Sequence, residues 1–168
     1  MRGASEFSYA ALMNPSQKLA QRLALGVPAL LLAGAYLSQY GFGLYPCEMC
    51  WWQRYPHFAA VGLAFLSTLV PPRTLWIGLA GLAVLISGLI GAFHAGVEYG
   101  WWQGLTTCSG PLGANGGDPL DALLNAPLVR CDVAAWTLGG ISLAGFNALI
   151  SVVSAMAIFV LLGKGRRA

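Results

Sequence analysis

The sequence predicts an all-α membrane protein, a four-helix transmembrane bundle with a short interfacial helix in its second outer loop. Of the 168 residues, 57% are hydrophobic and only 9% are charged, whereas soluble domains carry about 25% charged residues. Four apolar segments are each long enough to cross the bilayer, which takes about 20 helical residues. Basic residues gather at one side of these segments, as membrane topology requires.

Residues 19–162 form the predicted transmembrane domain. Residues 1–18 precede it as a cytoplasmic segment, whose first residues resemble an added leader with Met13 as a candidate native start, and residues 163–168 form a basic tail. Pro28 and Pro56 fall inside spans, which membrane helices tolerate. The four predicted spans run from about Leu19 to Tyr40, Cys50 to Val70, Leu75 to Val97 and Ile141 to Leu162.

Small residues recur along the third span, at Gly78, Gly81, Gly88, Gly91 and Ala95. Membrane helices approach one another closely where side chains are small. The simplest interpretation of this pattern is helix packing.

The distribution of basic residues predicts the orientation. Two of them, Arg54 and Arg130, fall on one side of the predicted spans, and seven fall on the other: Arg2, Lys18, Arg22, Arg73, Lys164, Arg166 and Arg167. The positive-inside rule then puts both termini in the cytoplasm. In a bacterium the chain would be a multi-pass protein of the inner membrane, with loops at about 41–49 and 98–140 in the periplasm. Five tryptophans near the outer boundary fit an aromatic belt: Trp51, Trp52, Trp101, Trp102 and Trp136.

The second outer loop contains the predicted interfacial helix. Asp118 and Pro119 suit the N-cap and first position of a helix. An apolar face near helical spacing follows, formed by Leu120, Leu123, Leu124 and Leu128. An amphipathic helix of this kind lies in the membrane surface. The Gly/Asn-rich stretch 113–117 before it has the composition of a loop.

The most informative motif is Cys47-Glu-Met-Cys50, which stands where a short loop meets the second span and precedes Arg54. If a helix begins near Cys50, its N-terminus and the guanidinium of Arg54 would both stabilise a thiolate there. The pattern therefore predicts a redox-active pair. The competing interpretations are a zinc half-site and two buried thiols, but a structural zinc site normally needs four ligands. The remaining Cys and His residues supply no second close pair, so we expect no metal.

The other two cysteines, Cys108 and Cys131, lie 23 positions apart in the second outer loop. Glycines between them leave the two free to meet or to separate, and we expect Cys108 to lie remote from membrane depth. An even number of cysteines on the outer side of a membrane fits disulfide chemistry.

His94 and Glu98 stand one turn apart at the outer end of the third span. Ionisable residues at membrane depth are functional candidates, and His94 could bond a ligand oxygen or relay a proton. His57, which follows Pro56, suits a mainly structural role, and Asn147 suits an interhelical hydrogen bond. No Lys/Arg-rich face suggests nucleic-acid binding.

Taken together, these residues resemble the DsbB family of quinone-dependent thiol oxidases. The resemblance covers about residues 19–162. In the first half of the chain it rests on Cys47-x-x-Cys50 with Arg54 and on His94-Ala-Gly-Val-Glu98 followed by a tryptophan pair. Further along it rests on Thr107-Cys108, on Ala126-Pro-Leu-Val-Arg-Cys131-Asp132 and on Ser142-Leu-Ala-Gly-Phe-Asn147. The resemblance implies a four-helix transmembrane fold and a quinone, ubiquinone or menaquinone, bound near the first cysteine pair.

The resemblance also implies a role for each site residue. Cys108 would be attacked by a periplasmic thioredoxin-fold oxidase of the DsbA type, and Cys131 would be its loop partner. Cys47 would exchange with the loop pair, and Cys50 would face the quinone. Arg54, His94 and Glu98 would lie at the quinone site. Partners would be this oxidase, the quinone pool and the lipid bilayer, with no nucleic acid, flavin or metal.

Two alternatives remain open from the residues alone. A quinone reductase of the vitamin-K-epoxide type also has a C-x-x-C motif at a membrane boundary, although the long loop between the third and fourth spans fits it poorly. A metal-binding or transport protein would instead bind zinc or copper and no quinone. Quinone extraction and a metal assay distinguish these classes.

Overall fold

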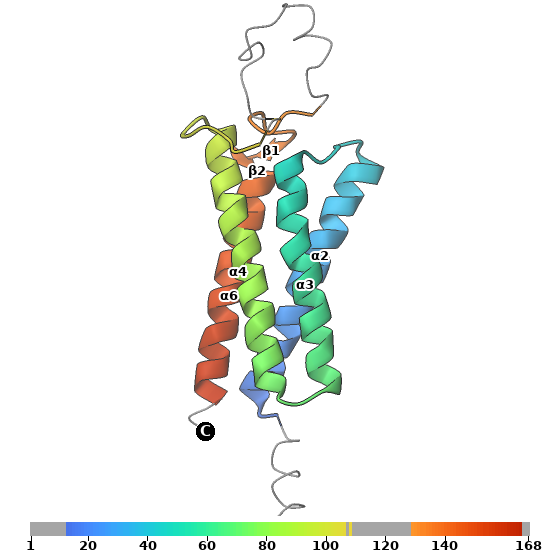
Figure 1. The fold of residues 1–168 in the computed structure, drawn as a ribbon, viewed down its shortest axis with the longest axis vertical. Coiled ribbons are helices and arrows are strands. Elements are labelled where there is room, and N and C mark those ends of the chain that lie inside the picture. Colours follow the sequence, from blue (N-terminus) through green and yellow to red (C-terminus); the bar gives the residue numbers. More distant parts are fainter. Residues whose placement is uncertain (1–12, 107, 109–128, 166–168) are drawn as a thin grey trace, which may run out of the picture.

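Four long helices lie side by side in the computed structural model, which describes residues 13–106, 108 and 129–165 (Figure 1). Neighbouring helices along the chain run in opposite directions, and α2 packs on both α3 and α6, so the four close into a ring. The helices are α2 (Pro15–Gly41), α3 (Glu48–Leu69), α4 (Arg73–Glu98) and α6 (Leu143–Gly165). The predicted interfacial helix, from Asp118 to Leu128, lies outside the described residues.

Two helices begin earlier than predicted because of their capping residues. The Asn14 side chain accepts a hydrogen bond from Gln17 N, and the Gln17 side chain bonds back to Asn14 N. This capping box, with Pro15 in the first turn, starts α2 four residues before the expected Leu19. Cys47 caps α3, so this helix starts at Glu48 rather than at Cys50.

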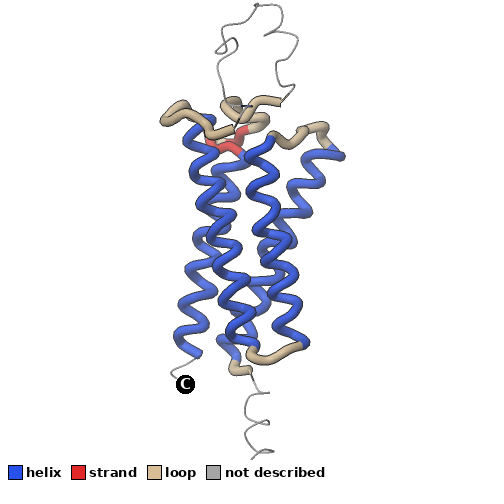
Figure 2. The backbone as a smooth tube through the Cα atoms, in the orientation of Figure 1, coloured by secondary structure: helices blue, strands red, loops and turns tan. Residues whose placement is uncertain are grey.

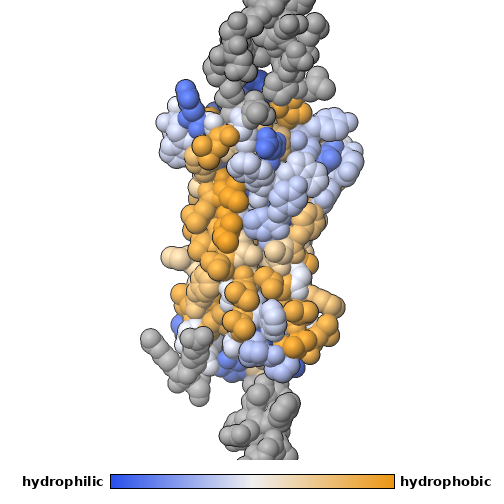
Figure 3. Space-filling model, in the orientation of Figure 1, coloured by the Kyte–Doolittle hydropathy of each residue, from blue (hydrophilic) through white to orange (hydrophobic). Residues whose placement is uncertain are grey.

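Three of the four helices, α2, α4 and α6, are long and apolar enough to cross a membrane. The space-filling view shows hydrophobic side chains down the left side and across the lower half of the molecule, a weakly hydrophilic area at the upper right, and the strongly hydrophilic side chains toward the two ends (Figure 3). α3 is less apolar, but three of its polar residues, Gln53, Arg54 and His57, are buried inside the helix group.

The predicted small-residue face of α4 is confirmed as a packing surface against α6. A Cβ atom added at Gly81 would lie 3.0 Å from Ile158, and one at Gly88 would lie 3.0 Å from both Ser151 and Val152. Side chains at these glycines would therefore force the two helices apart.

A short hairpin of two two-residue strands, which the sequence did not predict, connects the cysteine-bearing loop to α6. Strands β1 (Thr137–Leu138) and β2 (Ile141–Ser142) pair across Gly139 and Gly140, both with positive φ. Such φ values suit a tight hairpin turn and favour glycine. Because Ile141 and Ser142 belong to the hairpin, α6 begins at Leu143 and not at the expected Ile141.

The two ends of the described chain meet at one end of the molecule. Asn14 Nδ2 donates a hydrogen bond to Gly165 O at 2.9 Å, so the start of α2 touches the end of α6. The hairpin and the longer loops lie at the opposite end (Figure 2). The helices thus hold the candidate site far from the two ends of the described chain.

Candidate redox site

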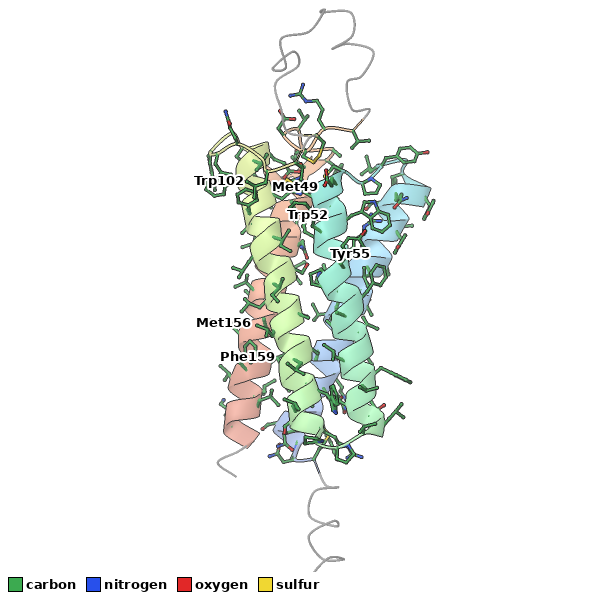
Figure 4. All side chains as sticks on the ribbon, viewed as in Figure 1. Met49, Trp52, Tyr55, Trp102, Met156 and Phe159 are labelled. Atoms are coloured by element: carbon green, nitrogen blue, oxygen red, sulfur yellow. A yellow bond between two sulfur atoms is a disulfide. The ribbon has the colours of Figure 1, made fainter. Side chains whose placement is uncertain are left out.

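All four cysteines meet in one buried cluster at the loop end of the helices. Cys47, Cys108 and Cys131 pack with Met49 and Val97, and the half-buried Cys50 lies against them. In Figure 4, Met49 and Trp52, which stand on either side of Cys50 in the sequence, lie at the upper end of α3. That Cys108 lies remote from membrane depth stays a prediction; in the structure it is 7% exposed and packs in the same cluster as Cys47.

Cys108 and Cys131 form a disulfide, which resolves the alternative that the sequence left open. Cys131 N also donates to Cys108 O at 3.0 Å. The Thr106 hydroxyl, which sequence reasoning did not single out, lies 3.0 Å from Cys108 Sγ and 3.4 Å from Cys131 Sγ. A hydroxyl in this position can donate to a sulfur that becomes a thiolate.

Cys47 and Cys50 form the second pair, and their Sγ atoms are 2.9 Å apart. Cys50 N donates to Cys47 Sγ at 3.2 Å, because Cys47 is the N-cap of α3. The helix N-terminus therefore lies against Cys47, not against Cys50 as we expected. The hydrogen bond from the Cys47 thiol to Cys50 and the burial of Cys47 both raise the pKa of Cys47.

His94 connects the two cysteine pairs. Its Nε2 atom lies 3.6 Å from Cys47 Sγ and 3.1 Å from Cys131 O. Its Nδ1 atom lies 2.8 Å from Gln53 Nε2, an amide donor, so Nδ1 accepts and the ring proton is on Nε2. Nε2–H therefore donates to the carbonyl of Cys131. Glu98 Oε1 lies 3.7 Å from the same Nε2 atom.

A polar network extends from His94 into the interior. Asn147 Nδ2 donates to Gln53 Oε1 at 2.8 Å, and Asn147 Oδ1 lies 2.9 Å from His57 Nε2. The Ser87 hydroxyl donates to Gln53 O. Asn147 thus makes the interhelical hydrogen bonds that the sequence predicted. Gln53 and Ser87 were missed, although each is a polar residue inside a predicted apolar span.

Arg54 is 6% exposed and joins α3 to the end of α2. Its Nη1 donates to Gln39 Oε1 at 2.7 Å and its Nη2 donates to Ala35 O at 3.1 Å. The guanidinium also lies 4.9 Å from the ring centroids of both Tyr36 and Trp51. Contacts with residues of both α2 and α3 therefore hold the guanidinium in place.

A cavity of about 260 Å³ lies between α2, α3 and α6 beside Cys50. Its lining is mainly apolar, with polar side chains from Gln53, Arg54, His57 and Asn147. Leu30 lines it although its side chain is 74% exposed, so the cavity reaches the lateral apolar surface. His94 and Glu98 stand on α4 and are not among the lining residues.

Three potential metal ligands lie close together in the cysteine cluster. They are the Sγ atoms of Cys47 and Cys50 and a ring nitrogen of His94, all within 4.8 Å of one another. Thiolates and imidazole are ligands that zinc and copper accept. Three ligands of this kind could hold a metal ion, which makes metal content a necessary control in every assay of the cysteines.

Comparison with known proteins places these features in one family. The family described as disulfide bond formation protein DsbB matches residues 17–161. A disulfide bond formation protein B of Verminephrobacter eiseniae is 33% identical over 86% of this chain and 85% of its own length. One of Paracidovorax citrulli is 32% identical over 83% of this chain and 82% of its own.

An uncharacterized protein of Rickettsia prowazekii is 22% identical over 80% of this chain and 81% of its own length. No solved structure gives a significant match. The two cysteine pairs, their shared buried cluster and the family match over most of the chain agree with one another. This chain belongs to the DsbB family of disulfide bond formation proteins and is a membrane oxidoreductase that generates disulfide bonds.

Proposed function

We propose that this oxidoreductase reoxidises a periplasmic thioredoxin-fold dithiol oxidase of the DsbA type and passes the electrons to a membrane quinone. The observation that carries the proposal is the arrangement of the two cysteine pairs. One pair is a disulfide and the other a dithiol, both belong to one buried cluster, and His94 contacts both. Such proximity suits thiol–disulfide exchange between the pairs.

The thiol steps follow from this arrangement. A partner thiolate attacks Cys108 Sγ, the Cys108–Cys131 bond breaks, and Cys131 leaves as a thiolate beside the Thr106 hydroxyl. When the inner pair is oxidised, Cys131 attacks Cys47 and Cys50 leaves as the thiolate. The second partner thiol then attacks the partner–Cys108 disulfide, which releases the oxidised partner and the Cys108 thiolate. Cys108 attacks Cys131 in the Cys47–Cys131 disulfide, which restores the loop disulfide and leaves Cys47 and Cys50 as a dithiol. Each step needs a thiolate attacker and a good leaving thiol.

The quinone fits the cavity beside Cys50. A quinone accepts two electrons and two protons, which is what the conversion of the inner dithiol to a disulfide releases. Cys50 lines the cavity, and Arg54, one turn away on the same face of α3, supplies N–H donors. The opening at Leu30 suits a ligand that arrives from the bilayer. We assign Arg54 to the binding of the quinone. We assign His94 and Glu98 to the cysteine cluster, because neither lines the cavity.

The proposal includes the topology. All four helices would cross the inner membrane, α3 with its polar residues turned inward, and both termini would be cytoplasmic. The seven-to-two distribution of basic residues supports this orientation. The contact between Asn14 and Gly165 supports termini on a common side. The cysteine loops, at about 41–49 and 98–140, would then face the periplasm.

The deciding experiment is quinone-dependent oxidation of a reduced DsbA-type protein by the purified chain. We expect multiple turnovers with quinone and at most one without it. Cys108→Ser should stop oxidation of the partner and leave electron exchange between Cys47, Cys50 and quinone intact. Partner oxidation that continues at the normal rate in Cys108→Ser would remove Cys108 as the entry sulfur. Turnover that requires added zinc or copper would instead support the metal alternative.

A further inference from the structure

His57 has a buried ring nitrogen that the thiol chemistry does not use. The side chain is 3% exposed and lines the cavity together with Cys50 and Arg54. Its Nδ1 atom is buried and has no hydrogen-bond partner among the described residues. A buried polar atom without a partner is costly, and each such atom in a native structure calls for an explanation.

The surrounding network determines which ring nitrogen carries the proton. Nε2 lies 2.9 Å from Asn147 Oδ1 and 2.8 Å from Ser87 Oγ. The Asn147 oxygen can only accept, because its amide nitrogen donates to Gln53 Oε1. The Ser87 hydrogen is directed to Gln53 O, so Ser87 Oγ also accepts. The proton of neutral His57 is therefore on Nε2, and Nδ1 is an acceptor.

Two of the polar groups that line the cavity, Arg54 and His57, are of opposite kind and lie along one face of α3. Cys50, Arg54 and His57 follow one another at i, i+4 and i+7, so His57 lies about 10 Å below Cys50 along the helix axis. Arg54 has five N–H groups and can only donate. His57 Nδ1 can only accept while the ring is neutral.

This pairing discriminates between the two forms of a quinone ring. The oxidised ring has carbonyl oxygens, which accept hydrogen bonds and cannot satisfy Nδ1. The reduced ring has hydroxyl groups, which donate. We propose that His57 Nδ1 accepts a hydrogen bond from a ring hydroxyl of the quinol, so that the cavity binds the reduced ring more tightly than the oxidised ring. The inference rests on the proposed quinone site and assigns a specificity-determining residue to it.

The consequence is a stronger oxidant in the site. A ligand that is bound more tightly in its reduced form has a higher reduction potential when bound. For a two-electron couple, a tenfold preference corresponds to about 30 mV. His57 would therefore favour the flow of electrons out of the inner dithiol.

Binding measured separately for the two ring forms tests the inference. In the full chain with Cys47→Ser and Cys50→Ser, neither form can react. Titration calorimetry under argon, with a soluble short-chain benzoquinone and with its hydroquinone, then gives two dissociation constants. We expect tighter binding of the hydroquinone. His57→Phe should weaken hydroquinone binding by roughly three- to tenfold, the value of one hydrogen bond, and change quinone binding by less than twofold.

Two further variants separate recognition from structure. His57→Asn can place an amide oxygen near the position of Nδ1 and should recover part of the preference. Ser151 does not line the cavity, and its hydroxyl donates to Asn147 Oδ1. Ser151→Ala removes this hydrogen bond and should leave the preference unchanged. Equal losses for both ring forms in His57→Phe, with no recovery in His57→Asn, would overturn the role of His57 and leave the quinone site intact. Failure of the background chain to bind either form would overturn the quinone site itself.

Discussion

The Cys47 thiol donates to Cys50 Sγ, and its pKa is raised by that bond and by burial. A raised pKa means that Cys47 keeps its proton as the pH rises through neutrality. In a reduced chain with Cys108→Ala and Cys131→Ala, iodoacetamide at pH 7 should therefore modify Cys50 before Cys47. The rate of Cys47 modification should increase only when the pH is above the ordinary pKa range of a cysteine thiol. Peptide mass spectrometry after timed quenching measures both rates, and faster modification of Cys47 at pH 7 would contradict the assignment.

Thr106 contacts both sulfurs of the loop disulfide. Thr106→Val keeps the shape of the side chain and removes the hydroxyl. A hydrogen bond to a charged group contributes about 1.5–3 kcal/mol, so reaction with a reduced partner should slow by roughly tenfold or more. Quenched-flow measurement in a chain with Cys47→Ser and Cys50→Ser isolates this step. Thr137→Val, at an exposed position of the hairpin, is the matched control, and equal rates in both variants would exclude Thr106.

Arg54 is predicted both to bind the quinone and to hold α2 against α3. Arg54→Ala should raise the apparent quinone Michaelis constant about tenfold, and it should also lower the melting temperature, because Gln39 and Ala35 O lose their donor. Arg54→Lys should recover only part of either effect, since an ammonium lacks the planar fork of the guanidinium. Quinone titration and thermal unfolding, run on the same preparations, separate the two roles. Equal Michaelis constants in all three proteins would remove Arg54 from the quinone site.

At the scale of elements, Gly91 determines how closely α4 approaches its neighbours. A Cβ atom there would lie 2.9 Å from Asn147 Nδ2, 3.0 Å from Ala144 O and 3.1 Å from Gln53 Oε1. Gly91→Ala should therefore destabilise the fold by about 1–3 kcal/mol, the usual range for overpacking.

Gly62 on α3 is the matched control for Gly91. A Cβ atom at Gly62 would meet nothing within 4 Å, so Gly62→Ala should be neutral or stabilising by up to about 1 kcal/mol through helix propensity. Unfolding of both variants in the same detergent measures the difference. A stable Gly91→Ala protein would mean that the Gln53–Asn147 contact can rearrange freely.

At the scale of the whole molecule, the proposed topology predicts which end of the helices an external reagent reaches. Leu138→Cys, which is exposed in the hairpin, should react with a membrane-impermeant maleimide added to intact spheroplasts. Gly163→Cys, exposed near the end of α6, should react only after the membrane is opened. Both variants are made in a chain whose native cysteines are replaced by serine. The reverse labelling pattern would invert the topology and place the cysteine loops in the cytoplasm.

The sequence by itself determined the class of protein and the chemistry. Apolar runs of about 20 residues predict membrane helices because an unpaired backbone polar group is too costly in hydrocarbon. The C-x-x-C motif with Arg54 predicted a redox-active pair, and the wider set of motifs resembles the DsbB family, which the family match confirms. These signals are local in sequence, so they could be recognised before any tertiary contact was known.

The tertiary structure alone decided which side chains share a site. The common depth of His94 and Arg54 suggested that both converge on one site. In the structure His94 contacts Cys47 and Cys131, whereas Arg54 lines a cavity that His94 does not line. His57 looked structural until Asn147, 90 residues away, accounted for its Nε2 atom, while Nδ1 has no partner among the described residues and the side chain lines the cavity. The rotation of each helix about its own axis decides such contacts, and that rotation depends on packing against neighbours that are distant in sequence.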